Sequence, residues 1–229
     1  MTFHRSLETE LLDVLPANDP AAARSRRDLR VLNALMLHPA IMADCMRRYA
    51  VDAPRRIIEL GAGDGSLMLR LGRRLARHWS NVAIILLDRQ HVVTPETRRA
   101  ISSLGWREDH VTQDVLEYLA IAEPADIIIT NLFLHHFRPV QISEIFTRCA
   151  KLAPLLIALE PRRATLPLLG SRLIGLLGCN HVTRHDAVAS VRAGFRDREL
   201  SALWPNRRGW NFDEESAGLW THCFVAQKC

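Results

Sequence analysis

The chain has 229 residues and a formal net charge of +5 at pH 7, and 48% of its residues are hydrophobic, which suits one globular α/β domain. Arginine supplies 28 of the 30 basic residues, but these form no polybasic block, so nucleic acid is not the expected partner. The N-terminus carries acidic residues and no continuous apolar core, unlike a signal peptide, and five cysteines without metal-site spacing suit the reducing cytoplasm.

Residues 1–52 are predicted to form an N-terminal helical cap. Leu29, Leu32, Leu35 and Met36 recur at helical spacing there, and Pro39 interrupts the pattern. Residues 53–229 form the second predicted unit, with runs that are apolar on both faces, like strands of a covered parallel sheet: "RRIIEL", "VAIILLD", "ADIIITN" and "LLIALE". Helical patterns separate them at about 66–78, 95–104 and 139–152. This alternation predicts a doubly wound α/β sheet.

The C-terminal part departs from the alternation. Residues 162–183 form an apolar insert around "ATLPLLGSRLIGLLG", which is too short to span a bilayer. A buried or cleft-covering helix is expected there, with peripheral membrane contact as the alternative. "TRHDAVASVRAGF" then predicts a helix that begins near Thr183 and ends at Gly194. "ELSALWP" and "GLWTHCFVAQ" are expected to be strands.

A glycine-rich loop follows the first predicted strand. Gly61, Gly63 and Gly65 alternate with other residues, whereas the dinucleotide fingerprint places its third glycine at the position of Ser66. The loop also carries two acids, at positions 59 and 64. Negative charge is poorly placed beside a pyrophosphate but suits an ammonium or a sulfonium group.

The stretch "ELGAGDG", residues 59–65, resembles motif I of the class I S-adenosylmethionine-dependent methyltransferases. "LHH" after the fourth predicted strand resembles the subgroup that methylates small molecules and quinones. The resemblance covers the chain from about residue 55 and implies a mostly parallel seven-stranded sheet. It also implies S-adenosylmethionine as the cofactor. The cofactor-binding residues it implies are Glu59, Gly61, Ala62, Gly63, Gly65, Asp88, Arg89, Asp114, Val115, Asn131 and Leu132.

In that resemblance, Asp88 ends the second strand and accepts from the ribose hydroxyls, while Arg89 flanks the adenine. Asp114 accepts from the adenine amino group, and capping of the next helix is its alternative role. Asn131 passes under the methionyl part. Arg27 or Asn33 is a candidate for the cofactor carboxylate, with a solvent-exposed helix face as the alternative.

His135 and His136 are the candidate general bases, because imidazole can accept a proton at neutral pH. One of them is expected to face the pocket and the other the scaffold, and packing in the turn is the alternative for both. No metal site is expected, since clustered carboxylates are absent. Further polar residues near the expected mouth are Glu160, Arg162, Arg163, His181, Arg184, His185 and Asp186.

The expected methyl acceptor is an oxygen or carbon of a small aromatic or polyketide-like molecule. "TNLFL" at the end of the fourth strand lacks the prolines typical of enzymes that methylate base amines, and the leucine-rich insert suits an apolar acceptor. The alternatives are an RNA- or ribosome-directed methyltransferase, a nicotinamide-dependent oxidoreductase and a non-catalytic cofactor-binding protein. The sequence leaves the oligomeric state open, a homodimer included.

Overall fold

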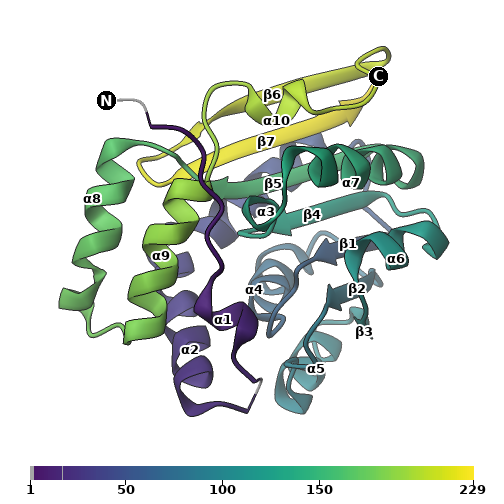
Figure 1. Ribbon diagram of the computed structural model, residues 1–229. Helices are drawn as coiled ribbons and strands as arrows, with labels where there is room; N and C mark the ends of the chain where they lie inside the picture. The colour runs from purple at the N-terminus through teal and green to yellow at the C-terminus, as the bar shows by residue number, and fades with distance from the viewer. Residues whose placement is uncertain (1–2, 17) are drawn as a thin grey trace.

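The computed structural model describes residues 3–16 and 18–229, which build one seven-stranded sheet in the order β3-β2-β1-β4-β5-β7-β6 (Figure 1). Its strands are β1 (Arg56–Leu60), β2 (Ala83–Asp88), β3 (Arg107–Thr112), β4 (Ile127–Asn131), β5 (Leu155–Pro161), β6 (Trp210–Ala217) and β7 (Thr221–Lys228). The first five strands are parallel, and β7 is antiparallel to both of its neighbours. The predicted mostly parallel seven-stranded sheet is confirmed.

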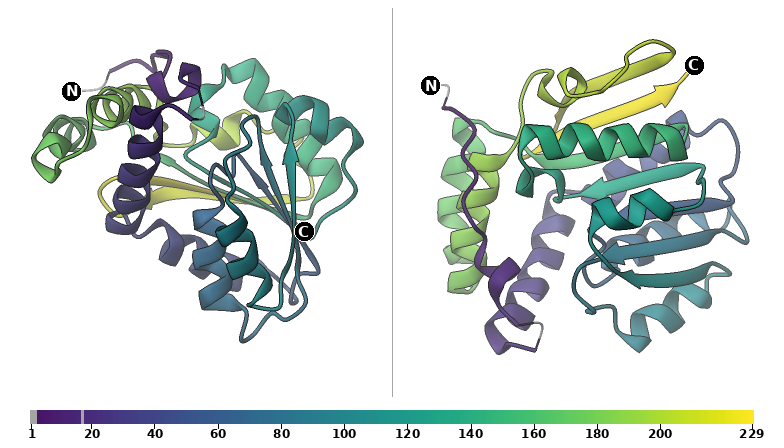
Figure 2. Two further views of the ribbon diagram at one scale, coloured as in Figure 1. Left: turned by 90° about the horizontal axis from the view of Figure 1, so that it is seen from below. Right: turned by 45° about the vertical axis from the view of Figure 1, so that its right-hand side comes forward.

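Helices cover both faces of the sheet, as Figure 2 shows. On one face, Ile57 and its sheet neighbours pack against α3 (His38–Tyr49), α4 (Ser66–Leu75) and α5 (Pro95–Ser102). On the other face, Ile58 packs in the core with α6 (Val115–Ile121), α7 (Pro139–Leu152) and α10 (Glu199–Ala202). Successive side chains of a strand point to opposite faces, which explains why the sequences of the central strands β1, β2, β4 and β5 are mostly apolar. Each large apolar side chain buried this way contributes about 1.5–3 kcal/mol.

A second group of helices stands at the carboxyl ends of the parallel strands. It consists of α1 (Leu11–Val14), α2 (Pro20–Leu35), α8 (Thr165–Leu173), the 3-10 helix η2 (Ile174–Leu177) and α9 (His181–Ala193) (Figure 1, left). We call this group of helices the lobe. Within it, Asp28 links α2 to the start of α9, because its carboxylate accepts from Asn180 N at 2.8 Å and from the Thr183 hydroxyl at 3.0 Å. Within residues 3–16 and 18–229, no helix has the length and apolar character needed to cross a membrane.

One sequence expectation in the C-terminal part was wrong, and one was confirmed. "ELSALWP" contains helix α10 instead of a strand, because Leu200 and Trp204, four residues apart, both enter the core. The Glu214 carboxylate accepts from the backbone N–H groups of Leu200 and Ser201, each at 2.8 Å. The helix expected from near Thr183 to Gly194 is α9, which begins at His181, because the Asn180 side chain caps it by accepting from Thr183 N at 2.9 Å.

Candidate functional site

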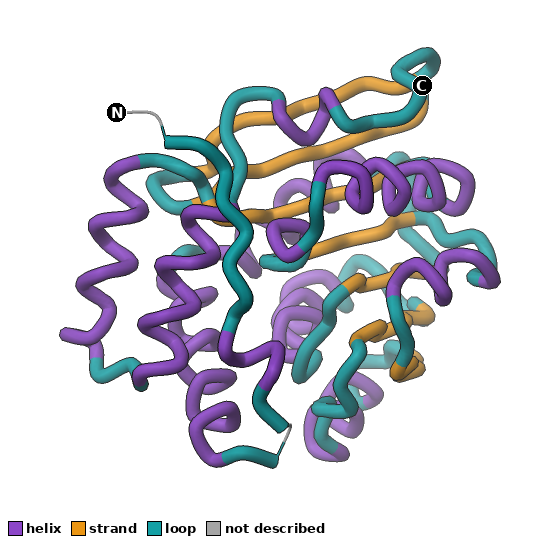
Figure 3. The backbone as a smooth tube through the Cα atoms, viewed as in Figure 1, coloured by secondary structure: helices purple, strands orange, loops and turns teal. Residues whose placement is uncertain are grey.

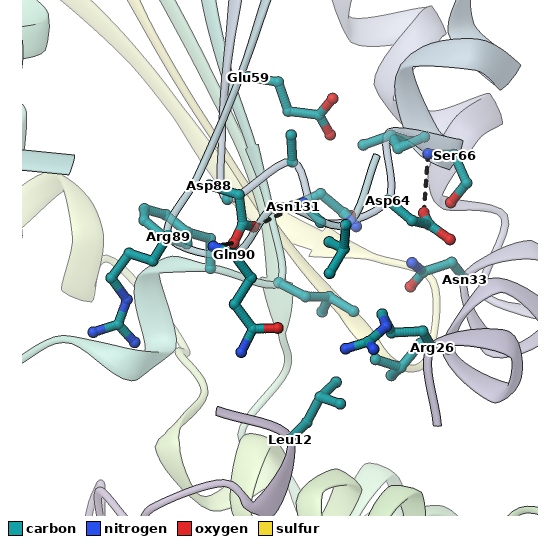
Figure 4. A pocket seen from close by; sticks show the side chains of 18 of the residues that line it. Leu12, Arg26, Asn33, Glu59, Asp64, Ser66, Asp88, Arg89, Gln90 and Asn131 are labelled. Atoms are coloured by element: carbon teal, nitrogen blue, oxygen red, sulfur yellow. Dashed lines mark hydrogen bonds between the residues drawn. The ribbon is translucent and has the colours of Figure 1, made fainter. Parts of the chain in front are cut away.

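A cavity of about 450 Å³ lies at the carboxyl ends of β1, β2 and β4, beside helix α2 (Figure 4). Figure 3 shows the loops that leave these strands, and they supply about half of the residues that line the cavity. This is the crevice where ligands bind in open parallel sheets. Its lining includes the predicted residues Glu59, Gly61, Ala62, Gly63, Asp88, Arg89, Asn131, Leu132 and His136.

The glycine loop is held tightly against its surroundings. Gly61 has φ +74°, and a Cβ there would meet the Phe133 ring at 2.2 Å, so only glycine fits. The N–H groups of Gly61 and Ala62 both donate to Leu87 O at 2.9 Å, which joins the loop to β2. Gly63 has φ +52°, and no atom lies within 4 Å of the position of an added Cβ. The loop therefore brings bare backbone to the cavity at Gly63.

Acidic side chains line the inner wall of the cavity. Glu59 is 2% exposed, and its Oε2 has no hydrogen-bond partner among the described residues. Burial first, and then the charges of Asp64 and Asp88, raise the pKa of Glu59 well above its usual range. Asp88 accepts from Gly63 N at 2.8 Å and from Gln90 N at 2.9 Å. A buried carboxylate without a partner is costly, so this wall suits a cationic or N–H-donating ligand.

Helix α2 supplies the opposite wall. Arg26, Arg30 and Asn33 line the cavity at helical spacing, and Arg30 forms an ion pair with Asp64 (Figure 4 shows Arg26 and Asn33). Asn33 was a predicted contact for the cofactor carboxylate, and its Oδ1 is buried without a partner among the described residues. Arg27, the other candidate, is exposed and does not line the cavity. The i, i+4, i+7 spacing of residues 26, 30 and 33 is the sequence signal that could have selected the correct face.

Asp114 and Val115 are not brought to the cavity. The Asp114 carboxylate accepts from Leu116 N at 2.8 Å and from Glu117 N at 3.4 Å, so it caps α6, the alternative role that the sequence left open. Gln90 and Val92, which follow β2, line the cavity instead. The seven further polar residues expected near the mouth, from Glu160 to Asp186, do not line this cavity.

The two adjacent histidines have different environments. His136 lines the cavity, and its Nδ1 lies 3.2 Å from Asp13 Oδ2. His135 is 2% exposed, with Nδ1 2.8 Å from Glu160 Oε2 and Nε2 3.2 Å from Glu10 Oε1. Burial lowers the pKa of His135, but hydrogen bonds to Glu10 and Glu160 outweigh it and raise the value to about 9. His135 is thus a buried, charged residue that links Glu10 of the N-terminal segment to Glu160 of β5.

Glu10 and Asp13 were not identified from the sequence, because they precede the histidines by more than 120 residues and no local pattern marks them. Glu10, His135 and His136 bring potential metal-ligand atoms within 4.8 Å of one another. Glu10 and His135 are already paired with each other, and His135 also pairs with Glu160. We therefore interpret the group as an ion-pair network that joins the N-terminal segment to the loop after β4.

A second cavity, of about 420 Å³, adjoins the first and shares Leu29 and Leu132 with it. Leu132 has φ +52°, a strained conformation that directs the chain between the two cavities. Helices α2, α8 and α9, the 3-10 helix η2, and the residues Met36, Pro161 and Trp220 complete the wall. The residues known to line it include no Asp, Glu, Lys, Arg or His. An ionised ligand would be poorly accommodated there.

No family model and no curated protein sequence matches the chain. Among solved structures, the pyocyanin biosynthetic protein PhzM is 18% identical, with a TM-score of 0.63 over 93% of this chain and 60% of its own. A putative O-methyltransferase from Nostoc punctiforme is 13% identical, with a TM-score of 0.63 over 98% of this chain and 64% of its own.

The plantazolicin methyltransferase BamL, solved in complex with a triazolic desmethylPZN analogue and S-adenosylhomocysteine (SAH), is 11% identical. Its TM-score is 0.64 over 94% of this chain and 92% of its own. The chain thus spans less than two thirds of PhzM and of the Nostoc protein, but nearly all of BamL. The strand order and these structural similarities lead to the same conclusion. The chain has the fold of the class I S-adenosylmethionine-dependent methyltransferases.

Proposed function

We propose that the chain binds S-adenosylmethionine in the first cavity and transfers its methyl group to an oxygen, or a carbon, of a small apolar molecule in the second. The observation that carries this proposal is the pairing of the two cavities. One has an acidic wall and a bare glycine loop, the other is apolar, and they share Leu29 and Leu132. The cofactor supplies an electrophilic methyl group on a sulfonium.

The residues of the first cavity fit that cofactor. Glu59 and Asn33 carry buried oxygens that lack a partner among the described residues, and an ammonium group would satisfy them. Asp88, at the end of β2, is placed to accept from ribose hydroxyls while it holds Gly63 N. BamL, of the same fold, was solved with S-adenosylhomocysteine, which supports the choice of cofactor.

The chain's own contribution to chemistry is positioning and proton removal. The apolar second cavity would orient the acceptor and exclude water. His136 is the proposed base for a hydroxyl acceptor, and Asp13 would hold its imidazole through Nδ1, at 3.2 Å. His135 is unsuited to this role, because hydrogen bonds to two carboxylates keep it buried and raise its pKa.

The test is transfer of labelled methyl from S-adenosylmethionine across a panel of phenols, quinols and hydroxylated polyketides, with RNA and protein as comparison substrates. Transfer to a small hydroxylated acceptor supports the proposal, and transfer only to RNA or protein would overturn it. Cofactor binding without transfer to any acceptor would favour the non-catalytic alternative.

The role of His136 is tested separately. His136→Ala should lower kcat by roughly 10²-fold or more for a hydroxyl acceptor. Asp13→Asn should lower it by less, and His91→Ala, at an exposed site outside both cavities, serves as the control. Near-normal turnover of a folded His136→Ala variant would remove this residue from the mechanism.

A further inference from the structure

The lobe carries an exposed leucine face beside the second cavity. It consists of Leu166, Leu169 and Leu173 of α8 and Leu176 and Leu177 of η2, whose exposed fractions run from 50% to 84%. Residues 166, 169 and 173 lie on one side of their helix because they are three and four positions apart. Figure 1 shows α8 at the outer edge of the molecule, away from the sheet. A contiguous apolar surface of this kind marks an interaction site.

The second cavity opens within this face. Leu173, Leu176 and Leu177 are exposed and also line the cavity, and Leu35 of α2, 60% exposed, borders it from the other side. A molecule that reaches the cavity by this route therefore passes the leucine face.

Arginines surround the leucine face. Arg172 belongs to α8 and is exposed. Arg184 of α9 lies across η2, since its Cδ would be 3.0 Å from a Cβ on Gly175. Arg24 of α2 donates to Gly178 O at 3.1 Å, at the end of η2.

Within α2, α8, η2 and α9, acidic side chains do not offset this charge. The elements α2, α8, η2 and α9 contain only the acids Asp28 and Asp186. Asp28 is engaged with Asn180 and Thr183, and Asp186 is buried and accepts from the N–H groups of Leu11 and Leu12. The face thus combines exposed leucines with positive charge.

We propose that the leucine face docks on the surface of an anionic phospholipid bilayer. Apolar side chains would enter the headgroup boundary while the arginines contact lipid phosphates, as interfacial helices do. The nature of the acceptor is an inference that rests on the proposed function: it would be a lipophilic molecule that moves from the bilayer into the second cavity. A second copy of this chain would explain the leucines, but it would place the same arginines against one another.

Vesicle co-sedimentation tests the docking without turnover. The full chain should bind vesicles of phosphatidylcholine with phosphatidylglycerol roughly tenfold more tightly than phosphatidylcholine alone, and added salt should weaken that binding. Leu166→Ser with Leu169→Ser, which line neither cavity, should weaken it roughly tenfold. Arg172→Glu should do the same, and Arg172→Lys should retain binding.

The control is Ile121→Ser with Val140→Ser, which alters two exposed apolar residues on α6 and α7 and should leave vesicle binding unchanged. Thermal melts and affinity for S-adenosylhomocysteine establish that each variant is folded. Equal binding to neutral and anionic vesicles, no binding to either, or leucine-dependent dimerisation in light scattering without vesicle binding would each overturn the docking. Methyl transfer is measured separately on soluble acceptors, so failure of docking and failure of the proposed function give different results.

Discussion

Glu59 combines burial, an unpaired oxygen and a raised pKa at the end of β1. A ligand ammonium would favour the ionised carboxylate, so binding of S-adenosylhomocysteine should release a proton, and affinity should rise with pH until the raised pKa is passed. Glu59→Gln should weaken binding roughly tenfold and abolish the proton release. Calorimetry in buffers of different ionisation enthalpy measures both.

Glu59→Gln should weaken ligand binding but increase the stability of the ligand-free protein. Because the folded pKa of this acid is raised, the ligand-free protein loses stability as pH rises above the ordinary value of 4.5. Glu59→Gln should remove that loss in thermal melts at neutral pH. Glu117→Gln, at an exposed position on α6, is the control and should change neither readout. Unchanged affinity in Glu59→Gln would contradict the assigned contact.

Gly63 and Gly105 offer a matched pair of substitutions. Both have positive φ, +52° and +81°, and at both an added Cβ would meet no atom within 4 Å. Alanine at either position should therefore cost about 1–2 kcal/mol of stability through backbone strain. Only Gly63 lines the first cavity, so only Gly63→Ala should weaken S-adenosylhomocysteine binding. Equal affinity losses in the two variants would indicate a general effect of destabilisation.

Site residues that lie within a recognisable sequence pattern could be predicted, and site residues far from such a pattern could not. Glu59, Asp88 and Asn131 are each the last or the last but one residue of a strand, and parallel strands bring their ends to one edge, so their shared location could be predicted. Asp13 and Glu10 could not, since they reach the histidines only through tertiary packing. Two roles were compatible with the sequence around Asp114, adenine binding and helix capping, and in the structure Asp114 caps α6.

Among the elements, the parallel strands β1, β2, β4 and β5 and the long helices were predictable because their hydrophobic patterns are continuous, whereas β3, with the sequence "REDHVT", has no such pattern. The run "ELSALWP" was ambiguous, since a short apolar run fits a strand or one helical turn equally well. Strand β6 was missed, because its sequence "WNFDEESA" is mostly polar and Glu214 within it is buried against His222 at 2.9 Å. The strand forms through pairing with β7, and its own residues show no strand preference from which it could be predicted.

The N-terminal segment that contains α1 is attached by a titratable network. His135, with a pKa of about 9, contributes stability that is complete below its ordinary value of 6.5 and is lost as pH rises through 9. Glu10 and Glu160 have lowered pKa values, so their contribution is present above 4.5 and is lost as pH falls below it. Attachment should therefore be firmest between pH 4.5 and 6.5.

Limited proteolysis across pH measures that attachment. Cleavage within residues 3–16 should accelerate between pH 6.5 and 9, and Glu10→Gln should flatten this rise by removing one partner of His135. His91→Gln, at an exposed site, is the control. The idea would fail if the pH dependence of cleavage were the same in Glu10→Gln as in the unaltered chain.

For the whole molecule, cofactor binding and folding are linked by mass action. A ligand that binds only the folded chain at about a hundredfold excess over its Kd adds about 2.7 kcal/mol of stability. In a domain of 229 residues, this raises Tm by roughly 5–10 °C. S-adenosylhomocysteine should produce such a shift and NAD should not, because Glu59 can pair with an ammonium group, whereas a pyrophosphate would lie beside the negative charge of Asp88. A shift with NAD alone would favour the oxidoreductase alternative, and loss of the S-adenosylhomocysteine shift in Gly63→Ala but not in Gly105→Ala would locate the bound ligand at the glycine loop.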